Sequence, residues 1–157
     1  MTYGFEFLDG RWAIHNRRLV DLRDPACDEW VEFAAAGEDR PILHGLGNRG
    51  HFSTQAMPPD GRPFEGFTLR LFDPARGVWL IWWASTAIPG RLDPPVEGGF
   101  DRGVGIFECD DVINGIAVRV RFEWTADSDS PVWRQSFSYD AGATWRPNWV
   151  MELSRTD

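Results

Sequence analysis

The stretch Ile116-Ala117-Val118-Arg119-Val120-Arg121-Phe122-Glu123-Trp124 decides the fold class of this chain. Its large apolar residues recur at every second position, whereas Arg119, Arg121 and Glu123 lie between them. Successive side chains of a β-strand point to opposite faces, so this alternation predicts a strand with one buried face. The run VWLIWW at residues 78–83 is apolar on both faces, as expected for a strand that is covered on both sides.

The same kind of pattern recurs along most of the chain. Further strands are predicted over residues 12–19, 30–36, 42–54, 66–72, 103–109, 132–139 and 145–153. Clusters of Gly, Pro, Asn and Asp separate these runs, and Asn114-Gly115 is the favoured pair for a tight type I′ hairpin. Residues 25–36 also permit an alternative interpretation as a short helix, because three of their apolar residues share one side.

Nine or ten short strands joined mainly by hairpin-length links predict an up-and-down antiparallel meander. The 157 residues suffice for one good core, so we predict a single domain over residues 1–157. Such a meander either packs as a sandwich or closes on itself. Closure removes the unpaired edges and leaves room inside for a small ligand, so the all-β fold is predicted to be a single barrel.

Composition and charge narrow the classes of partner. Nine Trp and eleven Phe exceed what a small core usually needs, so part of them is expected to line a cavity or an interface. A formal net charge of −8 repels phosphate backbones and anionic lipids, so neither nucleic-acid nor membrane binding is expected. The N-terminus shows no signal-peptide pattern, and Cys27 and Cys109 lack CxxC spacing. These features predict a cytoplasmic protein with free thiols.

The run SYDAGATW at residues 138–145 resembles the Asp-box of sialidase-type propellers. A propeller needs several four-stranded blades, and this chain is too short for them and contains one such run. We therefore interpret the run as a hairpin loop and not as a glycosidase site. Asp140 is expected to accept hydrogen bonds from backbone N–H groups, Gly142 to supply a positive φ, and Trp145 to pack under the turn.

Gly10-Arg11-Trp12 opens the first predicted strand and resembles the G-x-W signature of lipocalins. In that family the Trp packs across the closed barrel end beneath an Arg of the last strand, a part that the resemblance assigns to Arg155. The whole chain is similar to an uncharacterised family of bacterial lipocalin-like proteins in the calycin superfamily. The shared phrases are FLDGRW (7–12), GLGN (45–48), WLIWWAS (79–85), VRFEW (120–124), SYDAGATW (138–145) and NWVMEL (148–153). The resemblance implies a calycin/lipocalin-like barrel and no particular activity; Ser85 stands where several relatives have Asp.

The glycine-rich segment 44–51 carries the first candidate ligand contacts. Its three glycines allow sharp bends or close backbone approach, so we predict a loop at the barrel rim in which His44, Asn48 and His51 contact a ligand. A phosphate-binding loop is not favoured, because no Lys and no helix follow. A metal site of His44, His51 and Asp39 lacks a recognised ligand spacing, so no metal and no cofactor are predicted.

The predicted interior faces supply the other candidates. Gln135 shares the aromatic face of its strand, so its amide is expected to point inward and to need a hydrogen-bond partner. Trp83 and Trp149 share faces with other apolar residues and are predicted to be cavity walls. Arg121 lies opposite the apolar face of its strand, where an outward salt-bridge row is favoured. In a polar cavity it would instead anchor a carboxylate or enolate.

These patterns support two main functional hypotheses. The first is the binding of a small hydrophobic or aromatic molecule in the barrel cavity. The alternative is an enzyme on the same scaffold, such as a cyclase, isomerase or lyase acting on a natural-product-like substrate, with His15 or His44 as its acid or base. A homodimer that forms through exposed aromatic residues such as Trp30 or Trp82 is a third possibility.

Overall fold

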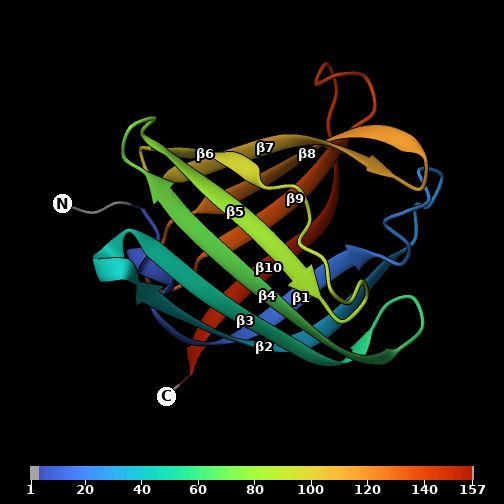
Figure 1. Ribbon diagram of the computed structural model, residues 1–157. Helices are drawn as coiled ribbons and strands as arrows, with labels where there is room; N and C mark the ends of the chain where they lie inside the picture. The colour runs from blue at the N-terminus through green and yellow to red at the C-terminus, as the bar shows by residue number, and fades with distance from the viewer. Residues whose placement is uncertain (1–3, 157) are drawn as a thin grey trace.

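The computed structural model describes residues 4–156, which form a closed barrel of ten antiparallel strands (Figure 1). The strands are β1 (Gly10–Leu19), β2 (Trp30–Ile42), β3 (Gly47–Met57), β4 (Arg62–Asp73), β5 (Val78–Ser85), β6 (Val96–Asp101), β7 (Val104–Ile113), β8 (Ile116–Thr125), β9 (Val132–Ser138) and β10 (Arg146–Thr156). Two short 3₁₀ helices, η1 (Glu6–Leu8) and η2 (Leu43–Gly45), precede β1 and β3. Each strand pairs with its neighbours in sequence, and β1 closes the barrel against β10. The predicted all-β, up-and-down barrel is confirmed.

Two of the predicted segments differ from the structure. The predicted strand 42–54 contains a turn, because β2 continues to Ile42, η2 reverses the chain and β3 begins at Gly47. The glycine-rich segment is therefore a turn followed by the start of a strand, and the predicted rim loop over its whole length is wrong. The helical alternative for residues 25–36 is also wrong, because β2 begins at Trp30 and pairs there with Leu19.

Strand β6 was not predicted, and its composition explains why. Gly98 and Gly99 occupy its centre and carry no side chains that could show an alternating pattern. A Cβ atom on Gly98 would lie 1.8 Å from the carbonyl oxygen of Ile106 on β7. The two strands approach each other closely here, which only glycine permits.

The antiparallel order places the loops at two ends of the barrel. The links after β1, β3, β5, β7 and β9 lie at one end, and η1 lies with the remaining links at the other. Trp12 donates its indole N–H to the carbonyl of Leu8 at 2.8 Å, and the Arg155 guanidinium lies over the Trp12 ring at 4.2 Å. Arg155 also donates to the carbonyl of Phe7 in η1 and to that of Asp9, the C-cap residue of η1. The lipocalin-like pairing of Trp12 with Arg155 is present and closes this end.

The Asp-box-like run forms the predicted hairpin turn. Asp140 accepts hydrogen bonds from the Thr144 N–H at 2.8 Å and from the hydroxyls of Thr144 and Ser138. These bonds lower the pKa of the Asp140 carboxyl to about 2. Gly142 has the expected positive φ of 91°. Trp145 is half-buried, and its ring contacts the Arg121 guanidinium at 3.9 Å.

The type I′ hairpin is also confirmed. Asn114 and Gly115 have φ values of 53° and 78°, the positive pair that this turn requires, and they join β7 to β8 with Ile113 opposite Ile116.

Candidate functional site

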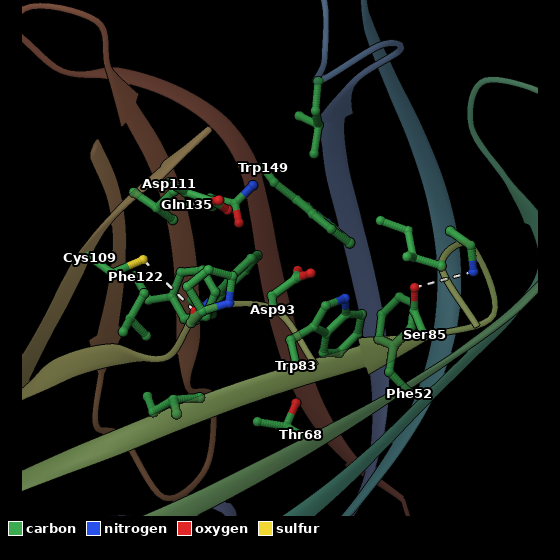
Figure 2. Close-up of a pocket in the computed structure, with 18 of the residues that line it drawn as sticks. Phe52, Thr68, Trp83, Ser85, Asp93, Cys109, Asp111, Phe122, Gln135 and Trp149 are labelled. Carbon is green, nitrogen blue, oxygen red and sulfur yellow. Dashed lines mark hydrogen bonds between the residues drawn. The ribbon is translucent and has the colours of Figure 1, made fainter. Parts of the chain in front are cut away.

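A cavity of about 430 Å³ lies inside the barrel and opens between the loops that follow β1, β3, β5 and β7. Its size lies within the range of roughly 300–1,000 Å³ typical of small-molecule sites. Figure 2 shows rings from several strands facing one another across it. The aromatic residues that form most of its wall include Phe52, Phe64, Trp83, Phe122, Trp133 and Trp149.

Trp83 forms one wall because Gly66, which lies diagonally across from it on β4, has no side chain. Its ring lies over Gly66, where a Cβ atom would come within 2.0 Å of the indole. Phe64 stacks against the same ring with a centroid distance of 6.2 Å and an interplanar angle of 23°. Trp83 therefore lies along the sheet and leaves the centre of the barrel open, as the prediction of a cavity wall required.

Trp149 and Gln135 form the opposite wall and are held by polar partners inside the barrel. Trp149 packs edge-on against Trp133, with ring centroids 5.4 Å apart, and its indole N–H donates to the Asn16 side chain at 3.0 Å. The Gln135 amide donates to the Asn148 side chain at 3.0 Å. A register shift between Pro147 and Trp149 on β10 accompanies the inward position of Asn148. Gln135 thus points inward as predicted, and its amide N–H₂ group bonds to a protein residue.

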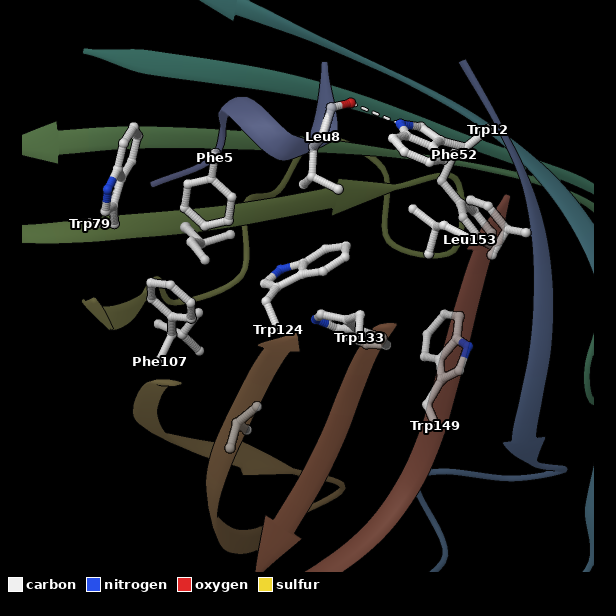
Figure 3. Packing of buried hydrophobic residues seen from close by; sticks show 14 of the residues in the cluster. Phe5, Leu8, Trp12, Phe52, Trp79, Phe107, Trp124, Trp133, Trp149 and Leu153 are labelled. Carbon is white, nitrogen blue, oxygen red and sulfur yellow. Dashed lines mark hydrogen bonds between the residues drawn. The ribbon is translucent and has the colours of Figure 1, made fainter. Parts of the chain in front are cut away.

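The floor of the cavity is an aromatic cluster at the closed end of the barrel (Figure 3). Phe5, from the segment before η1, contacts Trp79 edge-on at 4.9 Å between ring centroids and stacks on Phe107 at 5.6 Å. Trp124 projects from β8 towards the same cluster. These rings shield this end of the barrel from solvent.

An ion pair is buried beside this cluster. Arg70 donates from Nη1 to the Asp39 carboxylate at 2.7 Å and also to the Asn48 side chain, and its guanidinium lies 4.9 Å from the Phe5 ring centroid. Burial raises the pKa of Asp39, although the charge of Arg70 acts in the opposite direction. Gly50 makes room for the pair, because a Cβ atom there would lie 2.6 Å from Asp39 Oδ1. The two opposite charges neutralise each other.

Arg18 is a second buried arginine, on the β1 wall of the cavity, and is 9% exposed. Its Nη1 donates to the carbonyls of Leu19 at 3.0 Å and Val20 at 3.2 Å, and its guanidinium lies 5.1 Å from the Trp149 ring centroid. Burial lowers its pKa to about 10, against the attraction of Asp21. Arg18 therefore remains positively charged at neutral pH.

Two acids and a thiol lie at the mouth of the cavity, as Figure 2 shows. Asp93 belongs to the link between β5 and β6, and its N–H donates to the Trp83 carbonyl at 2.8 Å. Burial, and then the nearby charge of Asp111, raise the pKa of Asp93. Burial and the neighbouring carboxylates raise the pKa of Cys109 to about 12, so the thiol is protonated and a poor nucleophile.

Four of the seven predicted ligand contacts line the cavity, namely His51, Trp83, Gln135 and Trp149, and the last three form its wall with their side chains. The His51 side chain alternates to the exposed face of β3, where it lies 3.7 Å from Glu65. Asn48 is buried, but it bonds to Arg70 behind the floor.

The remaining predicted positions need correction. Arg121 faces outward, as the salt-bridge interpretation favoured, with its Nη2 atom 2.8 Å from Glu108 and its guanidinium 3.9 Å from the Trp145 ring centroid. It therefore cannot anchor a ligand inside the barrel. His44 is exposed on η2 at the closed end, and His15 is exposed on the outer face of β1, 3.3 Å from Glu32. Neither histidine can act as an acid or base in the cavity.

The sequence-based reasoning missed Arg18 and Arg70, although the strand alternation contained the signal. Arg18 lies an even number of positions after Trp12, and Arg70 lies an even number after Gly66, so each shares the inward face. A charged residue on an otherwise apolar strand face is the pattern to look for.

Within residues 4–156, no group of three or more His, Cys, Asp or Glu side chains is arranged to hold a metal ion. None of the helices in that range is long and apolar enough to span a membrane. Trp30, a candidate for a homodimer interface, is 47% exposed at the start of β2, and Trp82 lies on the outer face of β5. Dimerisation through these residues stays a prediction.

Comparison with known proteins supports the architecture. No family model matches the chain, and no curated protein matches its sequence. Among solved structures, the barrel is similar to the S-type phycobiliprotein lyase CPES from Guillardia theta, with a TM-score of 0.55 over 98% of this chain and 90% of that one. The two sequences are 11% identical, so the likeness shows the calycin-like fold alone.

Proposed function

We propose that the protein binds a small, largely apolar and aromatic molecule inside its barrel. The observation that carries this proposal is the cavity of about 430 Å³, which is closed by aromatic side chains at one end and open at the other. Aromatic walls with a few fixed polar groups are typical of sites that hold ring-containing ligands. The wall residues Trp83 and Trp149 would contact the ligand rings, and Gln135 would contribute to its orientation.

Tryptophan fluorescence provides the first test. N-phenyl-1-naphthylamine, a neutral aromatic probe, should bind with saturation and quench the tryptophan emission. Trp149→Leu removes a wall ring and should weaken binding at least about tenfold, since a buried aromatic contact is among the strongest in such sites. The matched control is Trp30→Leu, which changes an exposed ring outside the barrel and should leave the affinity unchanged.

A native mass spectrum of the purified protein would identify a co-purified molecule directly. Absence of saturable probe binding, or equal effects of the Trp149 and Trp30 substitutions, would rule out the cavity as the binding site.

An enzyme on the same scaffold is the second candidate, and Asp93 is the observation that favours it. Its raised pKa makes it the carboxyl in the cavity best suited to hold and donate a proton. The structurally similar protein is a phycobiliprotein lyase, so this barrel shape is compatible with catalysis. If the co-purified ligand is turned over, Asp93→Asn should abolish turnover and retain probe binding; undiminished turnover would exclude Asp93 as the acid.

A further inference from the structure

The buried charges of the barrel do not balance. The buried charged side chains of residues 4–156 are Arg18, Asp39 and Arg70. Asp39 and Arg70 form an ion pair at 2.7 Å, whereas no carboxylate oxygen of the described chain lies within 4.0 Å of Arg18. A desolvated charge normally has a partner of opposite sign in contact with it, whereas Asp21 attracts Arg18 only from beyond 4.0 Å.

The hydrogen bonds of Arg18 are also incomplete. A guanidinium group carries five N–H donors, and the two bonds of Arg18 to described residues both start from Nη1. The Nε atom is buried without a hydrogen-bond partner, as is Nε of Arg70. Nη2 of Arg18 has no acceptor among the described residues and is not fully buried, so a molecule in the cavity can reach it. Buried polar groups are almost always satisfied in folded proteins, so this unused capacity needs an explanation.

The position of Arg18 suggests what would supply the missing partner. The guanidinium lies on the cavity wall, directly beside the Trp149 ring at 5.1 Å from its centroid. A molecule whose ring packs against this wall would bring a group attached to that ring next to Arg18. A carboxylate has the charge and the acceptor oxygens that the guanidinium lacks.

We propose that Arg18 anchors the carboxylate of an aromatic acid bound in the cavity. This inference rests on the proposed function and adds to it the chemical class of the ligand. The bonds from Nη1 to Leu19 and Val20 fix the guanidinium in place, and the ligand carboxylate bonds to Nη2. Arg70 does not compete for the carboxylate, because Asp39 already neutralises it.

The test uses two compounds of the same shape that differ in charge, 2-naphthoate and 2-naphthamide, and isothermal titration calorimetry. The wild-type protein should bind the acid at least about tenfold more tightly than the amide, despite its net charge of −8. Arg18→Met should remove this preference and leave the affinity for the amide unchanged. Arg17→Met is the matched control on the same strand: Arg17 faces outward towards Glu152, so its loss should not alter the preference.

Arg18→Lys decides the question if Arg18→Met does not fold. Lysine keeps the charge but loses the planar group, so the preference for the acid should fall without disappearing. Equal affinities of the wild type for acid and amide would overturn the proposal, as would a preference that Arg18→Lys or Arg18→Met leaves intact. In those cases Arg18 only holds the end of β1. The proposed function fails separately, if neither naphthalene compound nor N-phenyl-1-naphthylamine binds at all.

Discussion

Replacement of Arg70 by methionine is the most direct test of how the barrel floor is held. Methionine retains much of the length of the side chain, but it leaves the Asp39 carboxylate buried without its cation, because the 2.7 Å contact to Arg70 is lost. Both residues are buried, at 6% and 7% exposure, although both line the cavity, so solvent replaces the lost partner only poorly. Breaking a buried pair in this way costs about 3–5 kcal/mol of folding free energy.

The loss should depend on pH in a defined direction. Burial already raises the pKa of Asp39 in the folded protein, and removal of Arg70 raises it further. A carboxyl whose pKa is higher in the folded state than in the unfolded state favours the folded state when protonated, so stability falls as pH rises from about 4 through the folded-state pKa. Arg70→Met should therefore lose more stability relative to the wild type at about pH 8 than at about pH 5.

Thermal and urea unfolding followed by tryptophan fluorescence measure this effect. For a chain of 157 residues, a loss of 3–5 kcal/mol corresponds to a fall in melting temperature on the order of 10 °C. The matched control is Arg11→Met, which removes an exposed contact of 3.1 Å to Glu38 and should cost at most about 1 kcal/mol. A loss at Arg70 as small as that of the control, or one that is equal at both pH values, would refute the reasoning.

Three further predictions concern the wall, the hairpin and the thiol. Gly66→Ala should cost about 1–3 kcal/mol because its methyl group collides with Trp83, and the cost should largely vanish in a Trp83→Leu background; a double-mutant cycle from urea unfolding measures this. Asp140→Asn should lower the melting temperature by a few degrees at neutral pH, because it removes the acceptor of the turn. Because the Asp140 pKa is about 2, the stabilisation by its carboxylate is complete above about pH 4 and is lost as pH falls towards 2. The stability of the Asp140→Asn protein should therefore depend less on pH in that window, which acid unfolding followed by circular dichroism would show. In a Cys27→Ala protein, Cys109 should react with a thiol reagent at least about tenfold more slowly when folded than in urea, because its pKa is about 12.

The barrel could be predicted from the sequence because the patterns that indicate its strands and turns involve residues close together in the chain. The alternation in β8 and the turn at Asn114-Gly115 each depend on neighbouring residues, and both appear in the structure as predicted. Strand β6 escaped prediction because the requirement at Gly98 is set by Ile106 on another strand. Packing between residues far apart in the chain does not appear in the alternation of apolar and polar residues.

The site was predictable only in part, for a related reason. The wall residues Trp83, Gln135 and Trp149 followed from the apolar faces of their strands. The histidines and Arg121 were chosen for their chemistry, and the strand alternation placed their side chains on the outside. Arg18 was overlooked because a charged residue was not expected on an inward face. The alternation of side chains along a strand therefore locates cavity residues better than the chemical type of a residue does.

Glycine positions show why a chain so rich in aromatic residues keeps an open centre. Gly66 and Gly50 both face the interior, and in each case a side chain from a neighbouring strand, Trp83 or Asp39, occupies the space that a Cβ atom would need. These side chains lie along the sheet instead of crossing the barrel, and the rings of the wall pack against one another at their edges. The cavity is thus lined by side chains that already have protein partners. Among the buried charged side chains of the described residues, Arg18 is the one that lacks an oppositely charged group within 4.0 Å, so a charged group of a bound ligand should affect binding most strongly there.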